Sequence, residues 1–289
     1  MNSVESGRTA VAWRAGPVSL RTRIVDAAAR LMVTAIGHLV HDRKRLLAVA
    51  DRLVSHGRFA DAAALADLVR RRTPFDGKLH LHLAEAALLR GDKAGAAELI
   101  DRLAIARRGI SRSAGLLLEV IGTVEAPRGY GVIFLNRQDR LPTPLPRMRL
   151  AEVIAAQAGW AATNGSSAAG RYQVIDHTLI TISAELGLDP QSRYDATLQD
   201  RIGHGLLTRR GFERFIARDL SLAAFALELA QEWAAFPVLA QVEGAHRVLE
   251  PGETFYAGDG RNRALMSPIL FAAILERCRA LAPHPEQPN

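Results

Sequence analysis

Apolar residues recur at helical spacing along most of the chain and predict a mainly α-helical protein. In contrast, residues 132–149 hold three prolines and no helical period, so a loop or irregular strand segment is expected there. Ser221 is a plausible N-cap for one late helix and Pro237 its stop. The helices are expected at residues 24–40, 111–125, 148–160, 175–186, 198–207, 222–235 and 268–281.

A 34-residue repeat organises the first part of the chain. The segment GRFADAA, which begins at Gly57, recurs as GDKAGAA from Gly91, and this offset of 34 residues is the tetratricopeptide period. Each glycine should lie in the turn between two helices, where the backbone needs a left-handed residue. We therefore expect a tetratricopeptide-like helical repeat domain at residues 21–110, behind a flexible basic arm at 1–20. The helix at 24–40 and the start of the next domain should cap the stack.

The positive charge of the chain is concentrated in this first part. Residues 1–110 contain 19 Lys and Arg against 11 Asp and Glu, whereas residues 111–289 contain 18 against 19. A basic half suggests a protein or anionic partner, although an Arg-rich composition alone would give the same count and the repeats could serve only stability. Nucleic acid is not expected, because the basic half has one tryptophan, Trp13, and few aromatic residues on which bases could stack.

The residues that bind metals or form disulfides are sparse. Cys278 is the single cysteine, which excludes an internal disulfide framework and a cysteine-based zinc site. His38 and His41, and likewise His80 and His82, lack carboxylates at ligand spacing, so no metal and no cofactor are expected.

The residue that draws attention chemically is Glu125. It closes the apolar helix predicted from residue 111, and Ala-Pro-Arg-Gly follows it. A carboxylate at a helix C-terminus among apolar neighbours should have a raised pKa, as a general acid working near neutral pH requires. Glu119, six residues earlier, should project about 120° away on the helix and is expected to be a surface charge.

The order of motifs around Glu125 resembles one known family. Glu125 is followed by Gly129-Tyr130-Gly131, then by SSAAGRYQVI at residues 166–175 and by EWAAFP at 232–237. This order resembles the phage lambda lysozyme (endolysin) family and, more loosely, the lytic transglycosylases, in which a Ser-x-x-Gly-x-x-Gln turn faces the catalytic Glu. The resemblance covers residues 112–240, with a weaker extension to 281.

The resemblance implies an α+β lysozyme-like catalytic domain at residues 111–289. Residues 243–289 would form its C-terminal extension, with a turn or short hairpin around Gly252, Gly258 and Gly260 and then the last helix. Glu125 would be the catalytic acid. The residues expected to bind substrate are Ser167, Gly170 and Gln173, together with Tyr130, Arg171 and Tyr172.

Three features of this expected site stay open. For Arg171 and Tyr172, core packing and ion pairing compete with substrate contact. Asp139 is a candidate second acidic residue. It lies in a stretch where the family carries a Gly-Gly and an Asp-His-Pro and this chain carries Phe-Leu-Asn-Arg and Asp-Arg-Leu-Pro.

The implied function is peptidoglycan cleavage. The family resemblance favours a lytic transglycosylase that cuts the MurNAc-GlcNAc β-1,4 bond and forms 1,6-anhydroMurNAc. A hydrolytic lysozyme with the same acid is one alternative. Another is an inactive peptidoglycan-binding or phage-tail or secretion-device protein, and a third is a nucleic-acid or membrane adaptor built on the repeats. No signal peptide or membrane span is recognised, so delivery to the cell wall in the periplasm would need lysis, a phage particle or a secretion machine.

Overall fold

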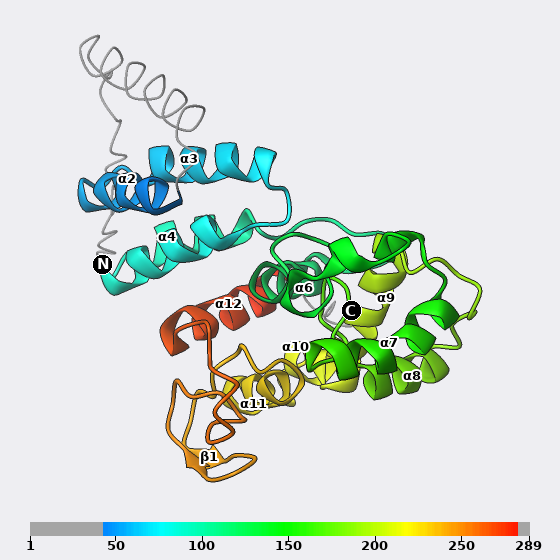
Figure 1. Ribbon diagram of the computed structural model, residues 1–289. Coiled ribbons are helices and arrows are strands. Elements are labelled where there is room, and N and C mark those ends of the chain that lie inside the picture. The colour runs from blue at the N-terminus through cyan, green and yellow to red at the C-terminus, as the bar shows by residue number, and fades with distance from the viewer. Residues whose placement is uncertain (1–42, 283–289) are drawn as a thin grey trace, which may run out of the picture.

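The computed structural model describes residues 43–282, and this part of the chain is mainly helical, as predicted (Figure 1). The predicted arm at 1–20, the helix at 24–40 and the pair His38 and His41 lie outside the described residues. The helices are α2 (Arg43–Ser55), α3 (Phe59–Arg72), α4 (Lys78–Leu89), α5 (Lys93–Asp101), α6 (Arg112–Glu125), α7 (Leu150–Asn164), α8 (Asp176–Glu185), α9 (Ala196–Arg209), α10 (Phe212–Ile216), α11 (Leu222–Glu232) and α12 (Pro268–Leu281). The strands β1 (Val242–Glu243) and β2 (Val248–Leu249) form one antiparallel pair.

The first four described helices follow the 34-residue repeat. The turns between α2 and α3 and between α4 and α5 contain Gly57 and Gly91, whose φ angles are +70° and +79°. These angles confirm that both glycines are left-handed, as predicted. Glycine suits these positions because a residue with a Cβ would be strained at such an angle. α2 packs against α3 and α4, and α4 packs closely along α5.

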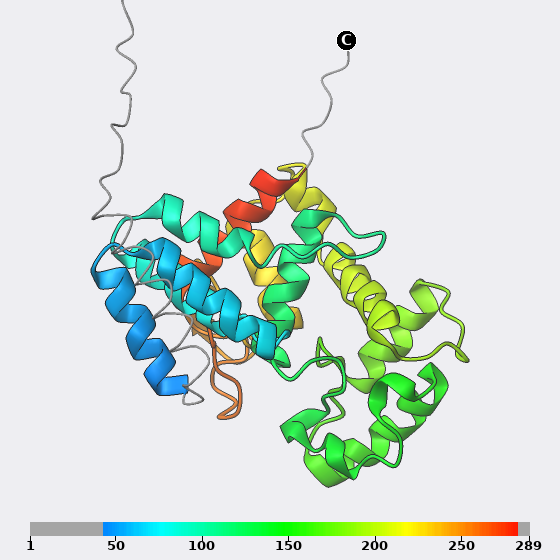
Figure 2. The same cartoon turned by 90° about the horizontal axis from the view of Figure 1, so that it is seen from above.

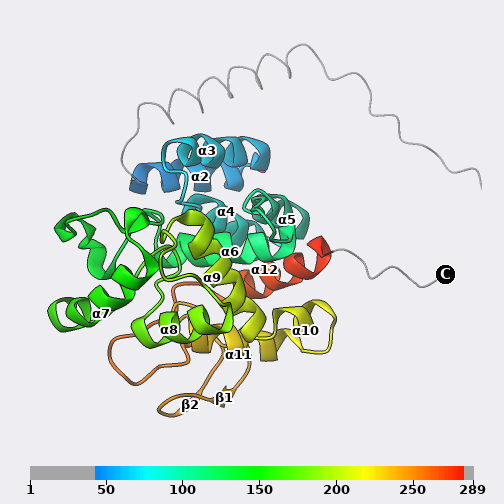
Figure 3. The same cartoon turned by 90° about the vertical axis from the view of Figure 1, so that its right-hand side faces the viewer.

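The last helix, α12, covers the repeat helices. It packs against α4, α5 and α6, so the C-terminal end of the chain supplies the cap that we expected from the start of the second domain. Figure 3 shows α6 and α12 between the repeat helices and the helices α9 to α11. A pair of hydrogen bonds from Arg277 to Asp101, with N···O distances of 2.9 and 2.6 Å, joins α12 to the end of α5. One continuous apolar core runs through both halves.

The helices of the second half follow their predicted signals in part. α7 ends at Asn164, four residues later than predicted, and α10 (Phe212–Ile216) was not predicted. Ser111 and Ser221 each cap a helix by accepting a hydrogen bond from a backbone N–H three residues on. α12 has the predicted bounds, but α11 ends at Glu232, because Trp233 is extended (φ −125°) before Pro237 is reached. The hairpin also lies earlier than predicted, at 242–249, and the glycine-rich segment after it forms turns.

The region at 132–149 is irregular, as predicted. It contains three short 3-10 turns, Phe134–Asn136, Gln138–Arg140 and Leu145–Arg147. Together with α7 and α8 it lies on one side of the molecule, and α2 lies on the other side (Figure 2). No helix in the described part of the chain has both the length and the apolar character to cross a membrane.

Candidate active site

Glu125 is the last residue of α6, where the sequence placed it. Its side chain is partly exposed, and within residues 43–282 its carboxyl group has no hydrogen-bond or ion-pair partner. Burial raises the pKa of Glu125 to about 7. The carboxyl group can therefore carry a proton near neutral pH, which is the state that a general acid needs.

Arg171 holds the end of α6 that carries Glu125. Its Nη1 donates to the carbonyl oxygens of Gly122 and Ala126 at 2.9 and 2.7 Å. These carbonyls lie on either side of Glu125 in the chain, and each also accepts a backbone hydrogen bond, from the N–H of Ala126 and of Gly129 respectively. The GRYQ segment therefore fixes the backbone on both sides of the candidate acid. Because the Arg171 side chain is 0% exposed, it cannot contact a sugar, and ion pairing is the interpretation that the structure supports.

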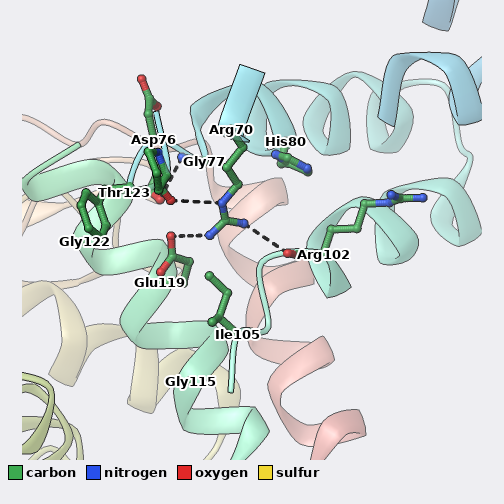
Figure 4. A network of polar contacts seen from close by, with 12 residues as sticks. Arg70, Asp76, Gly77, His80, Arg102, Ile105, Gly115, Glu119, Gly122 and Thr123 are labelled. Atoms are coloured by element: carbon green, nitrogen blue, oxygen red, sulfur yellow. Dashed lines mark hydrogen bonds and ion pairs between the residues drawn. The ribbon is translucent and has the colours of Figure 1, made fainter. Parts of the chain in front are cut away.

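Glu119 lies in a buried cluster of three arginines, so its expected position on the surface was wrong. Its side chain is 3% exposed. Oε1 accepts from Arg70 of α3 at 2.6 Å and from Arg171 at 3.1 Å, and Oε2 accepts from Arg107 at 2.6 Å. Figure 4 shows Arg70 reaching from α3 to Glu119 and to the carbonyl of Arg102. The surrounding α6 residues are apolar on every side, which is the sequence signal that predicts burial.

Asp200 of α9 joins this cluster and binds two of the predicted substrate residues. Its Oδ1 accepts hydrogen bonds from the hydroxyls of Tyr130, at 2.7 Å, and of Tyr172, and its Oδ2 pairs with Arg107 at 3.2 Å. Tyr172 is 1% exposed, so of its two open interpretations the structure supports core packing over substrate contact. Tyr130 stays half-buried, with its hydroxyl engaged by Asp200. Asp200 and Arg107 were missed in the sequence because their partners are distant in the chain.

Ser167 and Gly170 are buried and have structural roles in place of the predicted glycan contacts. The Ser167 hydroxyl accepts from the backbone N–H of Asp176 at 3.1 Å, at the start of α8. Gly170 has φ +79°, and a Cβ there would lie 2.4 Å from Oε1 of Gln199. Glycine is therefore needed at position 170 because α9 lies close to the turn. Gln199 of α9 holds the turn by accepting a hydrogen bond from the backbone N–H of Arg171.

Gln173 is the predicted substrate residue of this turn that keeps an accessible side chain. Its backbone is left-handed (φ +48°), and its side-chain nitrogen donates to the carbonyl of Gly170 at 2.8 Å. The side chain lines a cavity of about 260 Å³ with Tyr256, Glu232 and Arg209. Glu125 does not line this cavity, so Gln173 and Glu125 do not share it.

Asp139 is exposed in the short turn Gln138–Arg140. The hydrogen bonds and ion pairs of the described residues do not connect it to Glu125. Leu135, in the same loop, is left-handed (φ +60°) and 59% exposed. The stretch that departs from the family pattern is therefore also strained and solvent-facing.

The groove that reaches α6 nearest to Glu125 is formed by the repeat half and the C-terminal extension. It has a volume of about 640 Å³. Val124, the neighbour of Glu125, lies at its base, His82 and Glu85 of α4 line one side, and Arg263 and Leu265 line the other. Segments distant in sequence thus meet next to the C-terminal end of α6.

The histidines and several arginines of the repeat half are paired internally. Nε2 of His80 and of His82 contact Asp67 and Asp51 at 2.9 and 2.7 Å. No group of three or more potential metal ligands gathers anywhere in residues 43–282. Because Arg70 and Arg107 are bound to carboxylates of the second half, part of the basic excess of the first half is neutralised within the molecule.

No family model, curated protein or solved structure matches this chain.

Proposed function

We propose that the chain is a peptidoglycan-cleaving muramidase in which Glu125 is the general acid. The observation that carries the proposal is the state of this one carboxyl group. It is unpaired within the described residues, partly exposed at a helix end, and has a pKa raised by burial to about 7. Perturbed carboxyl groups of this kind are typical of catalytic acids, whereas a solvated glutamate at a helix end would titrate near its ordinary value.

The reaction we propose is that of a lytic transglycosylase. Glu125 protonates the oxygen of the MurNAc-GlcNAc bond, and the bond to C1 of MurNAc breaks. Glu125 then accepts the proton of the MurNAc C6 hydroxyl as that oxygen bonds to C1, which gives a 1,6-anhydro sugar. The substrate supplies the nucleophile, so a single acid suffices, whereas retaining and inverting hydrolases need two positioned carboxyl groups.

The exposed position of Asp139, without a contact to Glu125, supports the single-acid scheme over hydrolysis. Hydrolysis by the same acid is the second candidate. The third candidate is a module that binds glycan without cleaving it. The observation that favours it is the loop around Leu135, which departs from the family pattern and has a left-handed backbone. The substrate in all three cases is a peptidoglycan strand, and the cell wall is the site of action.

The deciding experiment digests purified sacculi and identifies the released muropeptides by mass spectrometry. We expect anhydro-ended products from the wild type and a loss of about 100- to 10,000-fold in initial rate for Glu125→Gln, which is the range that general acid catalysis typically contributes. Glu185→Gln is the matched control, because Glu185 also closes a helix but its side chain is 51% exposed. It should digest sacculi at the wild-type rate.

The variant Asp139→Asn separates the two chemistries. Unchanged release of anhydro ends supports the single-acid scheme, and reducing ends that disappear in this variant would establish hydrolysis by a carboxyl pair. No release of muropeptides by the folded wild type would refute the muramidase and leave the glycan-binding module.

A further inference from the structure

Phe75 presents an aromatic ring from the repeat half beside the loop that follows Glu125. It lies in the linker between α3 and α4 and is 37% exposed, although its ring is fixed by contacts on other sides. Its ring meets that of Tyr130 edge to face, with centroids 5.5 Å apart and an interplanar angle of 88°. Two aromatic rings from different halves of the chain therefore stand together near the candidate acid.

Backbone and side-chain hydrogen bonds hold the linker against the end of α6. The carbonyl of Phe75 accepts from Nη1 of Arg171 at 2.9 Å, and the same nitrogen binds the carbonyl of Ala126, the residue after Glu125. The N–H of Gly77 donates to Oγ1 of Thr123 at 3.3 Å, a contact that Figure 4 shows. The Phe75 position is thus coupled to the backbone on both sides of Glu125.

Gly129 makes room for the ring. A Cβ at Gly129 would lie 2.4 Å from Cδ2 of Phe75, and the φ of +98° at this position also disfavours any other residue. The loop after Glu125 is therefore built to let an aromatic side chain of the repeat half lie directly on it.

We propose that Phe75, together with Tyr130, forms a saccharide-binding subsite beside Glu125, so that the repeat half completes the glycan cleft. This inference rests on the proposed function, since it takes the peptidoglycan strand as the ligand. The guanidinium of Arg171 lies over the Phe75 ring, with Cζ 5.3 Å from the ring centroid, and Phe75 is 37% exposed. The part of the ring that stays exposed is a rigid apolar surface, which suits the C–H surface of a pyranose ring.

The test measures binding of a soluble glycan tetrasaccharide, two GlcNAc-MurNAc units, by isothermal titration calorimetry. Full-length Glu125→Gln protein is the parent, so that no cleavage occurs. We expect Phe75→Ala and Phe75→Leu to raise Kd about tenfold, or about 1.4 kcal/mol at 25 °C, and Phe75→Trp to restore it. The leucine variant keeps an apolar contact on Gly129, which separates loss of the ring from loss of packing.

Leu89→Ala is the control, because Leu89 is also an apolar residue of the repeat half and is 72% exposed. Its Kd should match that of the parent. A Kd within about twofold of the parent for both Phe75→Ala and Phe75→Leu, an equal loss in Leu89→Ala, or no binding by the parent would each overturn the subsite.

Kinetics distinguish failure of the subsite from failure of the proposed function. In the active protein, Phe75→Leu should raise the KM for sacculi with kcat and its pH profile unchanged, an outcome that a merely structural role would not give. If the wild type releases no muropeptides but Phe75-dependent tetrasaccharide binding persists, the subsite stands and the muramidase is refuted.

Discussion

Glu119 and Glu125 lie on one helix, six residues apart, in opposite surroundings. Glu119 is surrounded by Arg70, Arg107 and Arg171, which supply hydrogen bonds to both of its oxygens. Glu125 has no such partner within the described residues and is partly desolvated. Breaking a buried ion pair destabilises a fold, whereas a desolvated carboxyl group without a partner keeps its proton to a higher pH. The environment, and not the residue type, therefore separates the structural glutamate from the candidate acid.

The raised pKa of Glu125 predicts a pH-dependent stability. The pKa is about 7 in the folded protein against 4.5 for a free side chain, so between these values the folded state keeps a proton that the unfolded chain releases. The free energy of unfolding should therefore fall as the pH rises from 4.5 to 7, by about 2 kcal/mol after allowance for partial exposure. Glu125→Gln cannot release a proton and should lack this loss, which makes it more stable than the wild type at pH 8.

Urea titrations at pH 4.5 and pH 8 measure this difference. The control is Glu185→Gln, because Glu185 also ends a helix and its side chain is 51% exposed. Parallel pH dependence of the wild type and Glu125→Gln would show that Glu125 titrates as an ordinary surface glutamate.

Local signals in the sequence predicted most of the helices but not the contacts between them. Ser111, Ser221 and the bounds of α12 follow from capping and from apolar spacing, which are properties of neighbouring residues. The burial of Arg171 depends on Glu119, 52 residues away in the chain, and on the carbonyls at the end of α6. No local sequence pattern encodes such a distant partner. The segment GRYQ, residues 170–173, therefore suggested a glycan-binding surface, whereas most of the segment is buried and binds the end of α6.

The close contact between α6 and Arg171 gives a prediction at the level of one helix. A Cβ at Gly122 would lie 2.1 Å from Nε of Arg171, so Gly122→Ala must displace the buried guanidinium and should lower the free energy of unfolding by about 3 kcal/mol or more. Gly159, on the exposed side of α7, is the matched control, because nothing lies within 4 Å of a Cβ there. Gly159→Ala should stabilise the protein by about 0.5–1 kcal/mol, through helix propensity alone.

Urea denaturation followed by circular dichroism measures both variants. Because Arg171 fixes the carbonyls beside Glu125, Gly122→Ala should also lower the rate of sacculus digestion, and Gly159→Ala should not. Equal free energies of unfolding for the two variants would mean that the Arg171 side chain can be displaced at little cost, and that its contacts with the end of α6 contribute little to stability.

At the scale of the molecule, the repeat helices and the second half form one structural unit. α12, at the end of the sequence, packs on α4 and α5, and Arg70 of α3 reaches the Glu119 cluster. The hydroxyl of Ser113 on α6 donates to the carbonyl of Cys278 on α12 at 2.7 Å, inside the core. A sequence that indicates two successive domains thus folds with its two halves interlocked, and Phe75 of the first half lies against Gly129 and Tyr130 in the loop that follows Glu125.

This interlocking predicts that the protein unfolds in a single cooperative transition. Two independent domains would give separate transitions, whereas a shared core should give one. In a Trp13→Phe background, tryptophan fluorescence reports only Trp160 and Trp233 of the second half, while circular dichroism at 222 nm reports the helices of both halves. The two urea curves should therefore coincide. Arg70→Ala, a change in α3, removes one of the three cations around Glu119. It should lower the free energy of unfolding by about 1–3 kcal/mol and so lower the midpoints of both urea curves together. A shift confined to circular dichroism would instead show that the repeat half unfolds on its own, and the second half would then have to bind glycan without the ring of Phe75.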